Sequence, residues 1–264
     1  MDTIEAIILG IVQGLTEFLP VSSSGHLQIA KALMGVEIEQ NLLFDVTLHA
    51  ATVLSTIVVL WSEVARLLRG LFSRRFNEEQ AYVLKLLLSM IPIGIVGFTL
   101  KDRLDALLES PAILLVVGCM LLVTAALLAF AYYAKPRQKA QLSYRDAFLI
   151  GVAQAVAALP GLSRSGSTIA TGLLLGNRKQ TVAQFSFLMV LAPILGETFL
   201  ELMKGNLGAQ AIGSAPLAAG FVAAFVVGCL ACKFMIEIVK RGKLVWFSLY
   251  FSAAGTVSIL SYVL

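Results

Sequence analysis

The sequence predicts an all-α integral membrane protein made of two inverted repeats, with six transmembrane helices and two re-entrant helix–loop–helix hairpins that meet near the midplane. Three observations predict this fold class. The chain of 264 residues is 58% hydrophobic and only 14% charged, with a mean hydropathy of +0.88, whereas a soluble domain carries about 25% charged residues. Several apolar runs are long enough to cross a bilayer. Two more apolar stretches, broken by Pro, Gly and Ser, repeat at an offset of 141 residues.

The apolar runs each have at least the roughly 20 residues that a helix needs to cross about 30 Å of hydrocarbon. They are residues 42–61, 81–100, 111–132, 183–203, 216–239 and 245–264. The broken stretches, 2–36 and 143–177, each predict a helix, a loop and a second helix, and each half is too short to span. Irregular backbone lies at membrane depth only where protein or a water-filled cavity surrounds it. We therefore expect both stretches to be re-entrant hairpins.

The two broken stretches are copies of one unit. Their polar and small residues recur at a constant offset, and only the proline slips by one position. The matched pairs are Glu5–Asp146, Gly10–Gly151, Gln13–Gln154, Ser22–Ser163, Ser24–Ser165 and Gly25–Gly166. We therefore expect a single membrane domain over residues 1–264, with repeat 1 at 1–133 and repeat 2 at 142–264.

Basic residues predict the orientation of the spans. Lys and Arg gather in the loops after residue 61, at 133–145, after 177 and before 245, whereas the loops at 101–110 and 205–215 carry no net positive charge. Placing the basic loops in the cytoplasm gives a consistent topology. Three spans follow each hairpin, so the two repeats have opposite orientations. The first hairpin then enters from outside and the second from inside. A net charge of +4 does not indicate a nucleic-acid partner.

The hairpin tips predict a site for an anion. In each hairpin the second helix starts after a Ser/Gly run, and its N-terminus presents unpaired N–H groups and a partial positive charge. Short hydroxyl donors surround these starts: Ser22, Ser23, Ser24, Ser163, Ser165, Ser167 and Thr168. Arg164 adds a planar guanidinium suited to phosphate oxygens. The alternative is close packing by small residues and helix capping by serines. It fits many serines but not Arg164, whose burial costs about 2.5–3.5 kcal/mol.

Gln13 and Glu17 lie four residues apart, so they share one helix face. A carboxylate beside a phosphate site suggests a bridging Mg²⁺ or Ca²⁺, which takes oxygen ligands and shares them with substrate phosphates. The alternative, which can coexist, is an ion pair between Glu17 and Arg164.

His26 follows Ser23 by three residues, and a Ser–His pair near a Glu suits nucleophilic attack on phosphorus or activation of water. His49 lacks such neighbours, and we expect it to be packed or satisfied by a core hydrogen bond. Lys233 and Glu237 are spaced to pair with each other.

The stretches QGLTEFLPVSSSGH and PGLSRSGST resemble the two signature motifs of the undecaprenyl pyrophosphate phosphatases, the bacitracin-resistance family of bacterial membranes. The resemblance covers nearly the whole chain. It implies hydrolysis of undecaprenyl pyrophosphate to undecaprenyl phosphate and inorganic phosphate with a divalent cation, Mg²⁺ or Ca²⁺. It also implies recycling of the lipid carrier for peptidoglycan in the cytoplasmic (inner) membrane. Because bacitracin sequesters the pyrophosphate lipid, it would compete for the substrate, and the activity implies resistance. A homodimer is left open.

The resemblance also implies roles for individual residues. The family's catalytic pattern falls on Glu17, Ser23, His26 and Arg164, and its metal position on Glu17 with Gln13. Many members have Glu where this chain has Gln13, which carries no charge and so weakens that position as an anionic ligand. The implied phosphate-binding residues are Ser22, Ser24, Gly25, Gly161, Ser163, Ser165, Gly166 and Thr168.

Two questions stay open at the level of sequence. The nucleophile is Ser23 or a water activated by His26 and Glu17. A transporter or lipid flippase is the rival function, since inverted repeats with broken helices are a transporter architecture. A carrier needs no nucleophile, so the grouping of Ser23, His26 and Glu17 favours an enzyme. These residues belong to the hairpin that enters from outside, and we therefore expect catalysis to open to the extracytoplasmic face.

Overall fold

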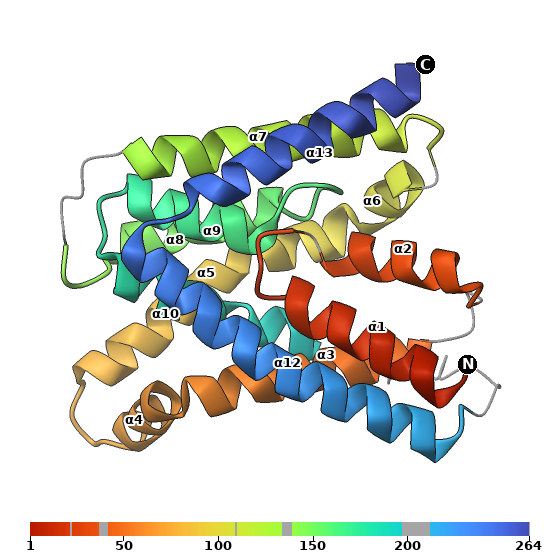
Figure 1. Ribbon diagram of the computed structural model, residues 1–264. Coiled ribbons are helices and arrows are strands. Elements are labelled where there is room, and N and C mark those ends of the chain that lie inside the picture. Colours follow the sequence, from red (N-terminus) through yellow and green to blue (C-terminus); the bar gives the residue numbers. More distant parts are fainter. Residues whose placement is uncertain (22, 37–41, 109, 134–138, 197–211, 264) are drawn as a thin grey trace. The chain divides into compact units, whose positions relative to one another are not determined.

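The structure, a computed structural model, describes residues 1–21, 23–36, 42–108, 110–133, 139–196 and 212–263 (Figure 1). Throughout these ranges the regular elements are helices, and the prediction of an all-α chain is confirmed. The helices are α1 Thr3–Thr16, α2 Ser23–Met34, α3 Leu42–Val59, α4 Trp61–Leu71, α5 Glu78–Thr99, α6 Lys101–Leu108, α7 Ile113–Tyr133, α8 Tyr144–Val156, α9 Arg164–Leu174, α10 Lys179–Met189, α12 Ser214–Arg241 and α13 Val245–Val263.

Four helices in the described part of the chain are long and apolar enough to cross a membrane, namely α5, α7, α12 and α13. They cover four of the predicted spans, with ends that differ by a few residues. A fifth candidate is α3 taken together with α4. The predicted span 183–203 begins within α10, continues after a turn at Val190 as helix to residue 196, and then leaves the described residues. Six complete spans therefore remain a prediction.

The predicted span 42–61 ends earlier than expected, because α3 gives way to α4 through a bend of 81°. Helix α4 carries Arg66 and Arg69 on one side, while Trp61 and Leu68 are exposed. Apolar and basic residues thus alternate with the 3.6-residue period of an amphipathic helix. Mean hydropathy averages the two sides, so the sequence predicts only a basic loop in this segment. The short α6 was not predicted either. At the far end of α12, Glu237 pairs with Arg241 (2.7 Å), so the predicted pairing of Glu237 with Lys233 is wrong.

Both broken stretches fold as predicted, into two short helices joined by a loop. Helix α1 packs on α2, and α8 packs on α9. The longest of the four, α1, has 14 residues and so spans about 21 Å, which is short of the hydrocarbon thickness. Each hairpin also begins with a cap at the same repeat position. Asp2 and Glu5 form a complete capping box, and Ser143 caps the N–H of Asp146.

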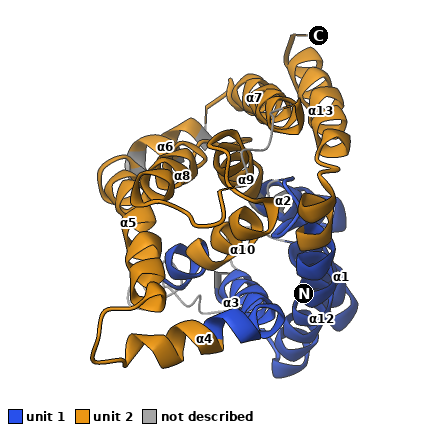
Figure 2. Cartoon of the chain, turned by 90° about the vertical axis from the view of Figure 1, so that its left-hand side faces the viewer, with its two compact units in different colours: residues 1–64, 190–235 blue, residues 65–189, 236–264 orange. Residues whose placement is uncertain are grey.

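The chain divides into two compact units that do not follow the two repeats (Figure 2). The first unit holds residues 1–64 and 190–235, and the second holds residues 65–189 and 236–264. Each unit thus combines one hairpin with a spanning helix from the opposite half of the sequence. The repeat boundaries remain a prediction from the sequence.

In the first unit, the hairpin of α1 and α2 packs on α3 and on α12. Its core is a cluster of buried apolar side chains: Ala6, Leu9, Leu27, Phe44, Leu48, Ala51 and Ala224. A Cβ atom added at Gly10 would lie 2.5 Å from the carbonyl oxygen of Gly220, and one at Gly14 would lie 2.6 Å from that of Ala224. Small residues one helical turn apart therefore let α1 and α12 approach closely.

In the second unit, the hairpin of α8 and α9 packs on α5, α7 and α10. The buried cluster here is Leu142, Ala147, Ile150, Phe185 and Met189. A Cβ atom added at Gly151 would collide with the backbone of Ser89 in α5. Gly151 is the repeat partner of Gly10, so each hairpin uses the same position to pack against a spanning helix of the other half. This shared packing holds the hairpin tips in place.

Candidate functional site

The tip of the second hairpin is organised by Ser163, which caps α9. Its hydroxyl oxygen accepts the N–H of Gly166 (3.2 Å), and its own N–H donates to the Thr124 hydroxyl oxygen (3.2 Å). Ser163 is buried. The capping role that sequence analysis offered for the serines is therefore confirmed at Ser163. The cap uses one N–H group of the helix and leaves the hydroxyl proton of Ser163 for another acceptor.

Two glycines shape this tip. Gly161 has a φ of +88°, a conformation that costs glycine little and other residues much, and a Cβ atom there would lie 2.7 Å from the backbone of Val117 in α7. A Cβ atom at Gly166 would lie 3.1 Å from the Ser163 hydroxyl oxygen. Both glycines were predicted to bind phosphate. That role stays a prediction, and the structure shows that both glycines let the loop and the first turn of α9 lie close to α7.

Arg164 and Ser165 are the first residues of α9, and both side chains are half-buried. The guanidinium of Arg164 thus comes from the turn whose N–H groups carry the positive end of the helix dipole. Phosphate binding by Thr168 stays a prediction. Its hydroxyl donates to the carbonyl oxygens of Arg164 (3.0 Å) and Ser165 (3.2 Å), so its proton is used inside the helix.

The tip of the first hairpin carries an amide and a carboxylate in contact. The Gln13 Nε2 atom donates to the Glu17 Oε2 atom at 3.1 Å, so the predicted shared face is confirmed. Gln13 is fully buried, and its Oε1 atom has no hydrogen-bond partner in the described structure. An orphaned amide oxygen beside a carboxylate is an oxygen donor set that suits a hard cation. Neither here nor at any other place in the described residues is a cluster of three or more His, Cys, Asp or Glu side chains found.

Ser23 and His26 lie in the first turn of α2, as predicted, and both are half-buried. Gly25 lies between them in the same turn. Ser22 lies outside the described residues, and of Ser24 the structure describes only the backbone. This hairpin belongs to the first compact unit, and Arg164 belongs to the second. The meeting of the two tips, and an ion pair between Glu17 and Arg164, therefore stay predictions.

Sequence reasoning missed Gln154 as a functional candidate. It lies in the last turn of α8 and is 1% exposed, and neither its Nε2 nor its Oε1 atom has a partner in the described part of the chain. The hydroxyl of Ser167, in the first turn of α9, is equally buried and unpartnered. Buried polar atoms normally find partners, so each exception needs an explanation. The signal was present in the sequence, because Gln154 is the repeat partner of Gln13.

Two further titratable groups are structural. The His49 Nδ1 atom lies 2.8 Å from the carbonyl oxygen of Asp45, which confirms the expected core hydrogen bond. Asp146 is buried, and the Lys139 Nζ atom lies 3.3 Å from its carboxylate. Burial raises the pKa of the Asp146 carboxyl, but hydrogen bonds from Ser143, Lys139 and Asn177 outweigh it. The pKa therefore lies below its ordinary value.

These features define a class of protein. It is an all-helical membrane protein with two hairpins of short helices, and the hairpin tips carry side chains that can bind phosphate. Comparison with known proteins gives the family. The profile described as bacitracin resistance protein BacA matches residues 6–257. The undecaprenyl-diphosphatase of Parabacteroides distasonis is 62% identical over 262 residues, covering 98% of both chains. That of Bacteroides thetaiotaomicron is 57% identical and covers 99% of both. That of Carboxydothermus hydrogenoformans is 36% identical over 98% of this chain and 97% of its own. The chain belongs to the BacA family.

Proposed function

We propose that this chain hydrolyses undecaprenyl pyrophosphate to undecaprenyl phosphate and inorganic phosphate, at a site formed by the two hairpin tips. Full-length relatives at 57–62% identity are undecaprenyl-diphosphatases, and the chain is a hydrolase of this type. Its product is the lipid carrier for peptidoglycan, and the activity supports bacitracin resistance. The single observation that carries the site is the chemistry of the tips: a nucleophile pair on one hairpin and a cationic, capped helix start on the other.

The second hairpin supplies the phosphate clamp. The Arg164 guanidinium, the hydroxyl proton of Ser163 and the positive end of the α9 dipole hold the pyrophosphate oxygens. Phosphoryl transfer needs mainly positioning and stabilisation of charge on the equatorial oxygens, which is what these donors provide. The unpartnered amide of Gln154 and hydroxyl of Ser167 add neutral donors to the same hairpin. Thr168 contributes indirectly, by fixing the carbonyls of the turn that bears Arg164.

The first hairpin supplies the nucleophile. The Ser23 oxygen attacks the terminal phosphorus, His26 accepts the hydroxyl proton, and undecaprenyl phosphate leaves. Water then cleaves the phosphoserine and releases inorganic phosphate. In the variant without a covalent intermediate, His26 and Glu17 activate a water directly. Both routes use His26 and give the same products, and only the first requires the Ser23 hydroxyl.

A divalent cation, Mg²⁺ or Ca²⁺, would be held by the Glu17 carboxylate and the orphaned Oε1 atom of Gln13. When bound, it would neutralise phosphate charge. The residues themselves orient the site: Gln13 donates to Glu17 and so fixes the direction of the carboxylate.

The distribution of Lys and Arg supports six spans in two inverted repeats, with the catalytic tip open to the extracytoplasmic face. The amphipathic α4, which carries Arg66 and Arg69, fits the cytoplasmic interface in this topology. The tips would then meet near the midplane, and bacitracin would compete for the pyrophosphate on the outer side.

The test is phosphate release from a polyprenyl pyrophosphate by purified protein in detergent, with and without EDTA. We expect release that needs the metal and is lost in Ser23→Ala. A well-folded wild-type protein that binds the lipid in the presence of metal but releases no phosphate would overturn the hydrolase assignment and favour transport.

A further inference from the structure

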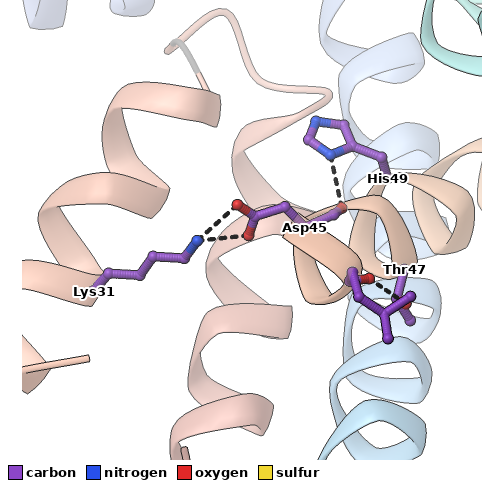
Figure 3. Close-up of polar contacts among 5 residues, drawn as sticks. Lys31, Asp45, Thr47 and His49 are labelled. Carbon is purple, nitrogen blue, oxygen red and sulfur yellow. Dashed lines mark hydrogen bonds and ion pairs between the residues drawn. The ribbon is translucent and has the colours of Figure 1, made fainter. Parts of the chain in front are cut away.

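An ion pair joins α2 to α3 inside the first compact unit. The Lys31 Nζ atom lies 2.7 Å from both carboxylate oxygens of Asp45, and Figure 3 shows the two side chains pointing toward one another from different helices. The Lys31 side chain is 3% exposed and that of Asp45 is 31% exposed. The charge of the buried lysine is therefore balanced by the Asp45 carboxylate, whereas the aspartate side chain remains partly exposed.

The local helix structure presents both charges at suitable ends. Lys31 lies in the last turn of α2 and Asp45 in the first turn of α3, where the helix dipoles favour a cation and an anion respectively. The Lys31 carbonyl also accepts the N–H of Val36 (3.0 Å), after Gly35 with a φ of +68°. This bond closes the C-terminus of α2. Main chain and side chain of Lys31 thus act together where α2 ends.

The Asp45 backbone is fixed as well. His49 must donate its Nδ1–H to the Asp45 carbonyl (2.8 Å), because a carbonyl oxygen only accepts (Figure 3). Thr47 in the same helix donates to the carbonyl of Leu43 (2.7 Å). The carboxylate is therefore presented to Lys31 from a turn whose own carbonyls are held in place.

The face of α2 that bears Lys31 also bears the candidate nucleophile. Ser23, Leu27 and Lys31 follow at intervals of four residues, so they lie on one side of the helix. Leu27 is buried in the core cluster with Phe44 and Leu48 of α3. This face is therefore fixed to α3 at two levels, by apolar packing in the middle and by the ion pair at the end. Ser23 is at the other end of the same face.

Stability alone does not explain such a pair. A buried ion pair contributes little net stability, because desolvation offsets the attraction, and apolar replacements of similar volume are often neutral or stabilising. We propose that the Lys31–Asp45 pair is a positioning device: it fixes the rotation and the axial register of α2 on α3 and thereby places Ser23 and His26 for catalysis. Lys31 acts through α2 and does not touch the substrate. The proposal rests on the proposed function.

The test compares three changes to the pair in phosphate release by purified protein with a polyprenyl pyrophosphate. Lys31→Met removes the charge, Lys31→Asp with Asp45→Lys reverses the pair, and Lys31→Met with Asp45→Leu replaces it by apolar groups. We expect kcat to fall about tenfold to a hundredfold in Lys31→Met, with KM little changed, because a small misplacement of a catalytic group costs that much. The reversed pair should recover part of kcat, because it restores the attraction but places each charge at the helix end whose dipole disfavours it.

The apolar double variant separates positioning from stability. It should keep the thermal unfolding midpoint of the wild type in detergent and still show the low kcat. The exposed pair Glu237–Arg241, with side chains 51% and 63% exposed, is the matched control, and Glu237→Gln should leave kcat unchanged. Normal kcat in the apolar double variant would overturn the positioning role. Absence of phosphate release from the wild type would instead overturn the proposed function.

Discussion

The two hairpins share a scaffold and differ in chemistry. Each starts with a capped helix, and each places a glycine of that helix, Gly10 or Gly151, against the backbone of a spanning helix from the other half of the sequence. The shared features all concern how the hairpin is held. Both hairpins therefore share the packing that fixes a short helix in a membrane, where small residues and close backbone contact replace the hydrophobic effect.

The tips diverge. In the first hairpin the polar groups are an amide, a carboxylate, a hydroxyl and an imidazole, which can accept protons or ligate a cation. In the second hairpin the Ser163 hydroxyl oxygen caps α9, the Thr168 hydroxyl donates to helix carbonyls, and Arg164 supplies a fixed positive charge. The difference indicates a division of labour in the proposed hydrolase: one tip attacks phosphorus and the other holds the phosphate.

The largest expected effect follows from removing the charge of the second tip. Arg164→Ala should lower kcat/KM at least about a thousandfold, as loss of a catalytic arginine does in phosphoryl transfer. Arg164→Lys should recover part of this, since it keeps the charge but not the planar fork. Both variants should keep the unfolding midpoint of the wild type. Near-normal turnover of a well-folded Arg164→Ala protein would remove the phosphate clamp from the second hairpin.

The shared scaffold predicts equal damage at its two glycines. Gly10→Ala and Gly151→Ala should each destabilise the protein by about 1–3 kcal/mol, because the added Cβ meets backbone that cannot rotate away. Gly94 in α5 has open space around it, so Gly94→Ala is the control and should be neutral or stabilising. Thermal unfolding in detergent measures all three. If only one of the two substitutions destabilises the protein, the two hairpins are not held by equivalent glycine contacts.

Much of this comparison could be predicted from the sequence, because it depends on patterns along the chain. Apolar length predicted α5, α7, α12 and α13, and the Ser/Gly runs predicted the breaks between the hairpin helices. The contact between Gln13 and Glu17 followed from helix periodicity alone. Helix α4 was missed because its apolar residues lie on one side only, which a hydropathy average hides.

The parts that could not be predicted depend on tertiary packing. Lys31 and Asp45 lie on different helices, and nothing in their spacing says that the lysine is buried. The hydrogen bonds of the Thr168 hydroxyl to the carbonyls of its own helix depend on a side-chain rotamer that the sequence does not specify. Gln154 could have been predicted from the sequence. It matches Gln13 at the repeat offset, and Gln13 was already a candidate site residue.

A smaller effect, a decrease in kcat/KM of about tenfold, is expected from replacing Gln154 in the second hairpin. If its amide serves the substrate, Gln154→Leu should lower kcat/KM about tenfold, or about 1.4 kcal/mol. Stability should be unchanged or higher, because the leucine removes an unsatisfied buried amide. Gln141, which is exposed, provides the control Gln141→Leu, with normal activity and stability. Unchanged activity in Gln154→Leu would restrict Gln154 to a structural role.

The smallest effect concerns the helix caps at the base of the hairpins. The folded-state pKa of Asp146 is lowered, so its contribution is present above the unfolded pKa of about 3.9 and is lost as pH falls through the folded pKa. Asp146→Asn should cost about 1 kcal/mol at pH 7, and the difference from wild type should shrink below about pH 4. Unfolding midpoints measured from pH 7 down to pH 3 test this. Glu5, the repeat partner of Asp146, forms a capping box with Asp2. Glu5→Gln should lower the free energy of unfolding by less than Asp146→Asn, because glutamine can also close a capping box. A difference for Asp146→Asn that persists at low pH would show that the Lys139 contact contributes through packing and that charge has little part in it.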